Sequence, residues 1–385
     1  MPVKFDFATA GRIIFRAGAV QELRTILPGL GKQPALLTGA GGANPEIVRQ
    51  MLADLDLGCT QISVDGEPTV AFIQSAVAQA REAGCDCVVA FGGGSVIDSG
   101  KALAALLVNG GDVLDYLEVV GKNQPLKKPG LPVVAVPTTA GTGSEVTRNA
   151  VLAVPEHKMK VSLRSAWMLP SIALVDPELT YSLPPALTAS TGMDALVQVL
   201  EPFVSIRANE LTDLFCREGM SRAVNSLLRA YADGADVRAR EDMAAASLMG
   251  GLALANAGLG AVHGFAAPLG AMFAAPHGAV CAALLAVTTE VNLRALRQRQ
   301  PASPALPRYQ EAAHILAGPT ASRDDLPRKL AEMSAALAIP GLSAWGMRRA
   351  DIPEAAERAA AASSMKANPI TLQREELVEI LERCL

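Results

Sequence analysis

One short apolar stretch in the N-terminal half most constrains how this chain can fold. The residues CDCVVAFGGG, 85–94, have the composition of a strand and show no polar face after Asp86. A strand of this kind is buried on both sides, which requires a parallel sheet with helices on each face. It is followed at once by SVIDSGKALAALLVN, residues 95–109, which has helical spacing. A strand, a glycine turn and a helix in this order form the repeating unit of such a sheet.

The same alternation of strands and helices extends over the first 180 residues. Strands are predicted at residues 12–16, 34–39, 59–64, 131–139 and 171–179, helices at 19–27, from 45 and at 69–84, and a hairpin at 149–154 and 157–163. From Thr188 onward the chain consists of Ala-, Leu- and Met-rich segments without a convincing strand. We therefore predict an α/β domain over residues 1–183 and an all-helical domain over 184–385, interrupted by a polar loop at 297–310.

Two glycine-rich turns follow neighbouring predicted strands. Gly93 and Gly94 allow a close backbone approach, and Ser95 opens a helix whose free N–H groups and positive dipole end suit a phosphate. The pattern is neither a P-loop nor GxGxxG, so a plain βα turn is the alternative. The second turn, VPTTAGTGSEVT at 136–147, is rich in hydroxyl groups. Because ligands bind beyond the carboxyl ends of parallel strands, the pair indicates one extended ligand, such as a dinucleotide.

The stretch from Met243 to Thr289 contains no Asp, Glu, Lys or Arg, yet it holds two of the four histidines, His263 and His277. It is rich in Gly and Ala and is interrupted by Pro268 and Pro276, which favours buried helices over a membrane span. On one straight helix the two histidines would lie roughly 21 Å apart. We expect the prolines and the glycines to break the helix and turn the chain back, so that both imidazoles reach one point.

Five segments, in order and spacing, resemble the iron-containing (group III) alcohol dehydrogenase family. They are GGGSVIDSGKA, PTTAGTGSEVT, LVDPELT, TGMDAL and HGFAAPLGAMFAAPHG. The resemblance implies an N-terminal dinucleotide-binding domain, a helical C-terminal domain, and a divalent metal in the cleft between them. It also implies hydride transfer between NAD(H) or NADP(H) and a small-molecule alcohol or its aldehyde or ketone, by a homodimer or a larger homo-oligomer.

The resemblance also implies individual site residues. Gly93, Gly94 and Ser95 would contact the pyrophosphate. The positions expected to line the ribose and nicotinamide are Thr138, Thr139, Thr147, Asn149 and Lys160. The family's metal ligands fall on Asp194, Gln198, His263 and His277, the two histidines being the expected catalytic residues and Fe²⁺ the expected ion ahead of Zn²⁺. Asp194 and Gln198 share one helix face because they are four residues apart.

Three positions depart from the family pattern. Gln198 replaces a histidine, and a neutral amide is a weaker ligand than imidazole for Fe²⁺ or Zn²⁺. A metal-independent reductase of an activated carbonyl acid, similar to the maleylacetate reductases, is therefore the alternative to a metal-assisted dehydrogenase. Ala267 replaces a histidine to which proton transfer is often assigned. Gly39 replaces an aspartate typical of NAD-preferring members, so we expect the chain to accept both NAD and NADP.

Composition excludes several other classes. Half of the 385 residues are hydrophobic, 19% are charged and the net charge is −4, without a basic patch that would favour nucleic acid. The N-terminal stretch has no signal-peptide core and the six cysteines are too sparse for a disulfide scaffold, which favours the cytoplasm and no membrane. A non-catalytic nucleotide-binding protein and a lyase similar to dehydroquinate synthase fit the motifs less well.

Overall fold

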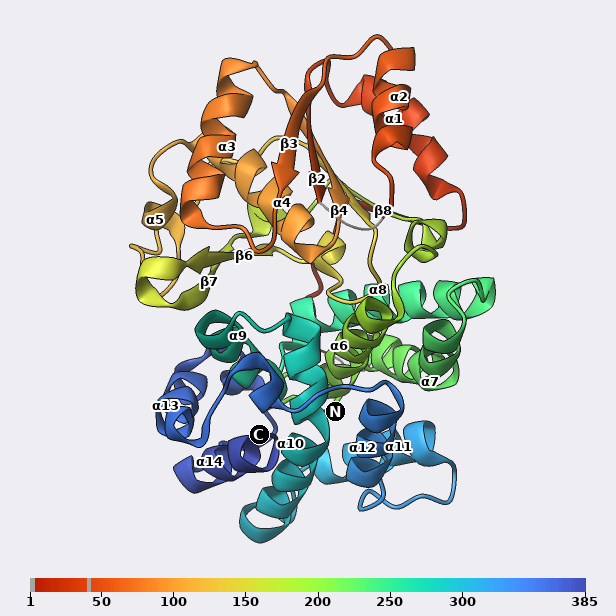
Figure 1. Cartoon of the computed structure of the whole chain (residues 1–385), viewed down its shortest axis with the longest axis vertical. Coiled ribbons are helices and arrows are strands. Elements are labelled where there is room, and N and C mark those ends of the chain that lie inside the picture. Colours follow the sequence, from red (N-terminus) through yellow and green to blue (C-terminus); the bar gives the residue numbers. More distant parts are fainter. Residues whose placement is uncertain (1–3, 40–42) are drawn as a thin grey trace. The chain divides into compact units, whose positions relative to one another are not determined.

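The computed structural model describes residues 4–39 and 43–385. The chain forms two compact units (Figure 1): one contains Ala8–Thr139 and Gly143–Leu183, and the other contains Pro184–Leu385 with Ala140–Thr142 and the segment ending at Phe7. The division after Leu183 falls directly before Pro184 and Pro185, close to where the sequence changes character. That the first unit binds a dinucleotide and the second a metal and substrate remains a prediction.

The first unit is built on a six-stranded sheet in the order β1-β8-β5-β4-β2-β3, with every pair parallel. The strands are β1 Arg12–Phe15, β2 Pro34–Gly39, β3 Thr60–Val64, β4 Cys87–Gly92, β5 Val133–Pro137 and β8 Ile172–Val175. Every residue of β4 is buried, and this strand lies between β2 and β5. The predicted parallel sheet, with the apolar strand in its interior, is therefore confirmed.

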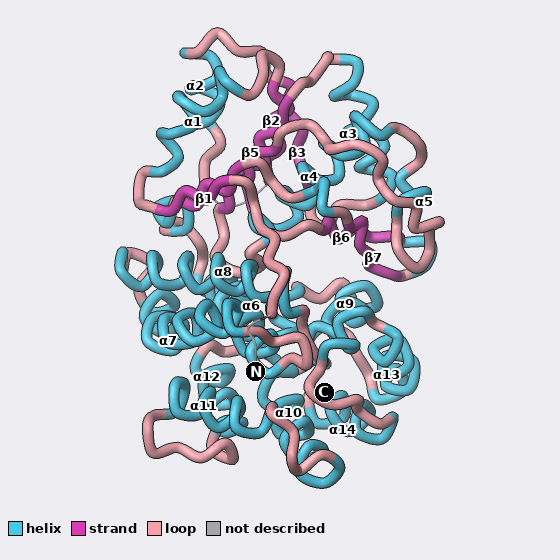
Figure 2. The backbone as a smooth tube through the Cα atoms, turned by 180° about the vertical axis from the view of Figure 1, so that it is seen from behind, coloured by secondary structure: helices cyan, strands magenta, loops and turns pink. Residues whose placement is uncertain are grey.

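Helices cover both faces of this sheet (Figure 2). They include α1 Leu23–Ile26, α2 Glu46–Asp54, α3 Val70–Glu82, α4 Gly94–Asn109 and α5 Val113–Tyr116. Successive residues of β4 serve different cores: Val88 packs with α3 and α4, whereas Val89 packs with α1 and α2. Strand neighbours point to opposite faces, so the continuous apolar run fills both cores.

Two local predictions in this unit need comment. The hairpin forms as an antiparallel pair, β6 Asn149–Val154 and β7 Met159–Arg164, as predicted. The helix predicted at 19–27 is instead a series of single turns, with 3₁₀ geometry at Ala19–Glu22 and Leu27–Gly29 on either side of α1. Pro28 and Gly29 end this series, because neither residue supports a continuing α-helix.

The second unit is helical: every residue from 184 to 385 is described, and none of them is in a strand. Its helices are α6 Pro185–Val204, α7 Glu210–Ala232, α8 Val237–Ala257, α9 Ala261–Phe273, α10 His277–Arg299, α11 Ala305–Ala317, α12 Leu326–Ala336, α13 Ile352–Ala361 and α14 Arg374–Arg383. The polar loop predicted at 297–310 is shorter and covers 300–304. Helix α11 begins before Pro307, which is tolerated in a first helical turn.

The charge-free stretch forms most of α8, all of α9 and the first half of α10. The predicted break at Pro268 is wrong, because this proline lies inside α9. The chain turns back instead after Phe273, where Ala274 has a φ of 49° and Pro276 caps α10. Among the described helices, α10 alone is long and apolar enough to span a membrane by itself, but 72% of its apolar window is buried inside the unit. Such burial is typical of a core helix.

Candidate active site

Helix α6 presents three polar side chains on one buried face. Asp194, Gln198 and Glu201 follow each other at intervals of four and three residues, which places them on the same side of a helix. They are only 2%, 2% and 6% exposed. The amide Nε2 of Gln198 donates a hydrogen bond of 2.9 Å to Oδ2 of Asp194. This contact fixes the carboxylate and leaves its other oxygen, Oδ1, for a different partner.

His263 lies in the first turn of α9 and is held by a buried carboxylate. Its Nδ1 is 2.7 Å from Oε2 of Glu201, while Oε1 of Glu201 accepts the backbone N–H of Val262 at 2.7 Å. Asn368 supports the same turn, since its Oδ1 accepts the backbone N–H of Ala261 at 3.0 Å. A carboxylate at Nδ1 favours the proton on that nitrogen, so the lone pair of Nε2 points away from Glu201.

His277 is the first residue of α10, and Cys281 follows one turn later on the same face. The Sγ of Cys281 is 3.7 Å from Nε2 of His277. Gly278 allows this helix to begin directly against α6, because a Cβ at that position would lie 2.3 Å from the carbonyl oxygen of Ser190. The His277 side chain is 33% exposed, so it lies on the solvent side of the group.

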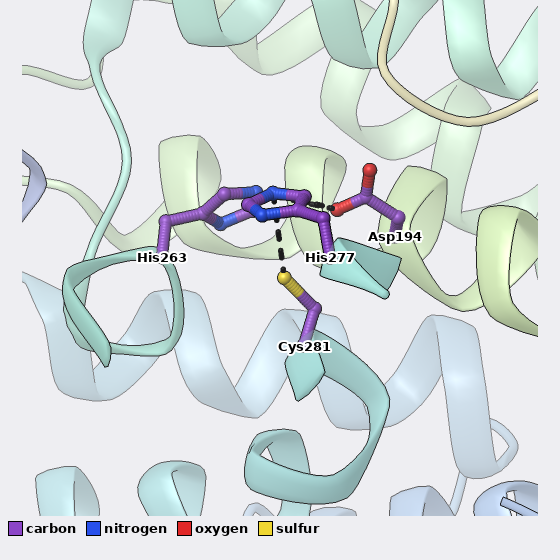
Figure 3. Close-up of side chains that lie close together, drawn as sticks. All are labelled: Asp194, His263, His277 and Cys281. Atoms are coloured by element: carbon purple, nitrogen blue, oxygen red, sulfur yellow. Dashed lines mark hydrogen bonds and ion pairs between the residues drawn. The ribbon is translucent and has the colours of Figure 1, made fainter. Parts of the chain in front are cut away.

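These side chains converge on one point (Figure 3). Asp194, His263, His277 and Cys281 each offer one ligand atom, and the four atoms lie within 4.8 Å of one another. Oδ1 of Asp194 is 3.3 Å from Nε2 of His263 and 3.8 Å from Nε2 of His277. The chain thus brings together three of the residues expected from the sequence. It adds Cys281, which the sequence analysis missed although its spacing of four residues from His277 was visible.

Three atoms of this group are buried without a hydrogen-bond partner in the described structure: Oδ1 of Asp194, Oε1 of Gln198 and Nε2 of His263. Buried polar atoms are rarely left unpaired, and such exceptions require an explanation. Oδ1 of Asp194 and, in the neutral ring, Nε2 of His263 carry lone pairs at the point of convergence, and a divalent cation binds oxygen and nitrogen donors of these types. The residues therefore fit a metal ion.

In the first unit, the two glycine-rich turns lie side by side, because β4 and β5 pair in parallel. Gly93 caps α4, and Gly94 and Ser95 are its first residues. A Cβ on Gly93 would lie 3.4 Å from the side chain of Thr139 in the second turn. The backbone N–H of Thr138 donates to the carbonyl of Gly92 at 3.0 Å. The predicted pyrophosphate residues therefore adjoin the first two threonines at the carboxyl ends of neighbouring strands.

The other expected cofactor residues lie on the hairpin and on β2. Asn149 begins β6, whereas Lys160 on β7 pairs with Ala153, further along the ladder. The Nζ of Lys160 is 3.1 Å from a carboxylate oxygen of Glu67. Gly39 ends β2, and the segment at 40–42 lies outside the described residues.

Comparison with known proteins decides the family. Residues 10–177 match the family described as iron-containing alcohol dehydrogenase, and residues 188–385 match its C-terminal domain. The chain belongs to the iron-containing alcohol dehydrogenase family. It is 33% identical to alcohol dehydrogenase 4 of Saccharomyces cerevisiae, over 96% of this chain and 95% of that protein. It is 32% identical to 1,3-propanediol dehydrogenase of Citrobacter freundii, over 98% of each chain.

Solved structures agree with this assignment. The crystal structure of a 1,3-propanediol oxidoreductase aligns with a TM-score of 0.90 and 31% identity, over 99% of this chain and 100% of that one. Sulfoacetaldehyde reductase from Bifidobacterium kashiwanohense in complex with NAD⁺ aligns with a TM-score of 0.85 and 26% identity, over 100% of this chain and 99% of that one. This member of the alcohol dehydrogenase family is thus an enzyme, an oxidoreductase, as the sequence predicted.

The side chains of the candidate metal site lie close enough to shift the pKa values of Asp194, His263 and His277. Burial alone would lower the pKa of both imidazoles, but their interactions with Cys281 and Asp194 outweigh it. The pKa of His263 is raised well above its usual value, and that of His277 is raised to about 8. Burial would raise the pKa of Asp194, yet the facing histidines lower it. Without a metal the imidazoles hold protons, so a cation must compete with them and its binding weakens at low pH.

A buried lysine that was not predicted from the sequence lies beside the glycine-rich turns. The Nζ of Lys101 donates to the carbonyl and hydroxyl oxygens of Ser144 at 3.0 and 2.7 Å, and to the hydroxyl of Thr147 at 3.0 Å. It also lies 2.9 Å from Oδ1 of Asp98, one turn earlier on α4. The hydroxyl of Thr147, an expected cofactor contact, is therefore already bound to the second turn's own framework. The spacing of three residues between Asp98 and Lys101 was the available signal.

Proposed function

We propose that this dehydrogenase interconverts a small-molecule alcohol and its aldehyde or ketone with NAD(P) and a divalent metal held by Asp194, His263 and His277. The convergence of these three side chains, with Oδ1 of Asp194 and Nε2 of His263 buried 3.3 Å apart and in no hydrogen bond, carries the proposal. A divalent ion bound there supplies a Lewis acid for the substrate oxygen. The family name implies iron.

The surrounding residues keep this group in place. Gln198 orients Asp194 through its amide, and Glu201 fixes the ring of His263. The apolar residues of α6, α9 and α10 form one core around these side chains and exclude water from all but the His277 side. Ala267, half-buried on α9, offers no proton. The proton of the alcohol must therefore leave through water or a hydroxyl of the bound coenzyme.

The proposed dinucleotide site is the pair of glycine-rich turns. Gly93, Gly94 and Ser95 would bind the pyrophosphate at the N-terminus of α4, where free N–H groups and the helix dipole favour an anion. Thr138, Thr139, Thr147, Asn149 and Lys160 would line the ribose and nicotinamide. Gly39 ends β2 without a carboxylate that would repel a 2′-phosphate, which supports use of both NAD and NADP. Titration of the enzyme with NAD⁺ and NADP⁺ tests this point.

Substitution of the histidines tests the metal site. His263→Ala or His277→Ala should lower kcat about a thousandfold, equivalent to roughly 4 kcal/mol of lost Lewis-acid stabilisation. The affinity for NAD(P)⁺ should change little, because these residues belong to the second unit. His314→Ala, at an exposed histidine on α11, is the matched control. Near-normal turnover in either site variant would contradict the assignment of that histidine as a metal ligand.

The metal-independent reductase remains the second candidate, because the neutral amide of Gln198 occupies a position where the family usually has an imidazole. Activity that survives exhaustive chelation in protein shown to be free of metal would favour this candidate. Loss of activity on chelation and its return with added Fe²⁺ or Zn²⁺ would favour the dehydrogenase.

We also propose a cytoplasmic homodimer or larger homo-oligomer. All six cysteines are free, which suits a reducing compartment. Strand β1 is an edge of the sheet and exposes Phe15, whose side chain would be covered by a second copy. Light scattering after size-exclusion chromatography measures the assembly.

A further inference from the structure

Cys281 is the one member of the converging group that the family pattern does not supply. We propose that its thiolate is the fourth ligand of the ion, and that Gln198 is not a ligand. The inference rests on the proposed metal centre and specifies its chemistry: one carboxylate, two imidazoles and one thiolate. The support for it comes from the distances between the ligand atoms and from the hydrogen bond of Gln198.

The distances match a four-ligand site. An ion with ordinary zinc bond lengths of about 2.0–2.3 Å in a tetrahedron keeps its ligand atoms about 3.3–3.6 Å apart. Three of the six separations are 3.3 Å from Asp194 to His263, 3.8 Å from Asp194 to His277, and 3.7 Å from His277 to Cys281, and the other pairs lie within 4.8 Å. Small movements would bring these atoms onto one ion.

In this arrangement Gln198 orients Asp194 and does not bind the ion. Its Nε2 already donates to Oδ2 of Asp194 at 2.9 Å, which orients the carboxylate so that Oδ1 faces the histidines. A flip of the amide that put Oε1 in the place of Nε2 would lose this hydrogen bond. The hydrogen bond is kept if Gln198 only orients Asp194, as residues that hydrogen-bond to metal ligands commonly do in proteins.

A thiolate changes which metal the site prefers. Thiolate is a soft ligand that favours zinc over harder ions, and Zn²⁺ also binds nitrogen and sulfur donors more tightly than Fe²⁺ does. We therefore expect this family member to hold Zn²⁺ or Co²⁺ in preference to Fe²⁺. Four protein ligands do not close the site to substrate, because a catalytic zinc ion can expand to five ligands.

Cobalt spectroscopy tests the inference independently of turnover. The full-length enzyme is stripped with a chelator, loaded with Co²⁺ under anaerobic conditions, and its absorption spectrum recorded. A thiolate ligand produces a charge-transfer band in the near ultraviolet, which nitrogen and oxygen ligands do not. We expect the band in the wild type, its loss in Cys281→Ser, and its retention in Cys59→Ser, which alters an exposed cysteine. Gln198→Ala should retain the band.

Metal competition gives a second readout. Cys281→Ser should lower Zn²⁺ affinity roughly 10–100-fold or more, since loss of even an outer-shell partner costs that much, and Fe²⁺ affinity should fall less. Bound Co²⁺ with visible d–d transitions but no charge-transfer band in the wild type would overturn the role of Cys281 and leave the proposed function intact. A wild-type enzyme that binds no Co²⁺ and remains active would overturn both.

Discussion

Glu201 contacts both the backbone N–H of Val262 and Nδ1 of His263, and through Nδ1 it determines that the lone pair is on Nε2. The substitution Glu201→Gln separates these two roles. The glutamate accepts two N–H groups at 2.7 Å, one from Val262 and one from His263. A glutamine has one accepting oxygen and one donating NH₂ group. If its oxygen retains Val262, its NH₂ group faces Nδ1 of His263, which must then accept. The ring proton moves to Nε2, and the lone pair that faced Asp194 is lost.

The magnitude follows from these contacts. Loss of a carboxylate that supports a metal-bound histidine typically lowers metal affinity about 10–100-fold. This corresponds to roughly 1.4–2.7 kcal/mol of binding free energy. Both hydrogen bonds persist in neutral form, so the free energy of unfolding should fall by only about 1 kcal/mol. Glu201→Gln should therefore bind metal poorly while remaining folded.

Two assays measure the effect. Competition with a chromophoric chelator gives the metal affinity, and Glu375→Gln, at an exposed glutamate, serves as the control. Nitrogen NMR of ring-labelled histidine reports the tautomer of the metal-free protein at alkaline pH, and the chain has only four histidines to assign. Wild-type metal affinity in Glu201→Gln, with the proton still on Nδ1 of His263, would refute the reasoning.

Two further predictions concern the first unit. Lys101→Met removes the buried ammonium that contacts Asp98 and Ser144, and should lower the free energy of unfolding by about 3–5 kcal/mol in urea denaturation; a loss below about 1 kcal/mol would contradict it. Burial raises the pKa of Glu145 to about 7. Since the folded protein then binds the proton more tightly than the unfolded chain, stability should fall as pH rises from about 4.5 to 7, by about 3 kcal/mol from this residue. Glu145→Gln should remove this component when pH–stability curves of the two proteins are compared, and unchanged pH dependence would count against it.

Features that depend on local pattern were predictable from sequence. The continuous apolar run at β4 requires burial on both faces, and the structure places Val88 and Val89 in opposite cores. The return of the chain between His263 and His277 was expected, and it occurs at Pro276 but not at Pro268. A proline can remain within a helix, as Pro268 does, and the turn forms where Ala274 adopts a positive φ.

Contacts between distant segments were harder to predict. Cys281 and Glu201 differ from ordinary core and helix residues only by their spacing from His277 and Asp194, and spacing alone does not show which helix face is turned inward. The burial of Lys101 was not predicted, because its partner Ser144 lies beyond another strand. These contacts depend on how α4, α6, α9 and α10 pack, which the motifs do not specify.

The central claim is that Asp194, His263 and His277 hold a functional divalent ion. The most direct test is elemental analysis of gently purified enzyme, paired with alcohol oxidation before chelation, after it, and after metal is returned. We predict one divalent ion per chain, loss of activity with the ion, recovery on reloading, and no ion in His263→Ala. Metal-free protein with undiminished activity would contradict the account.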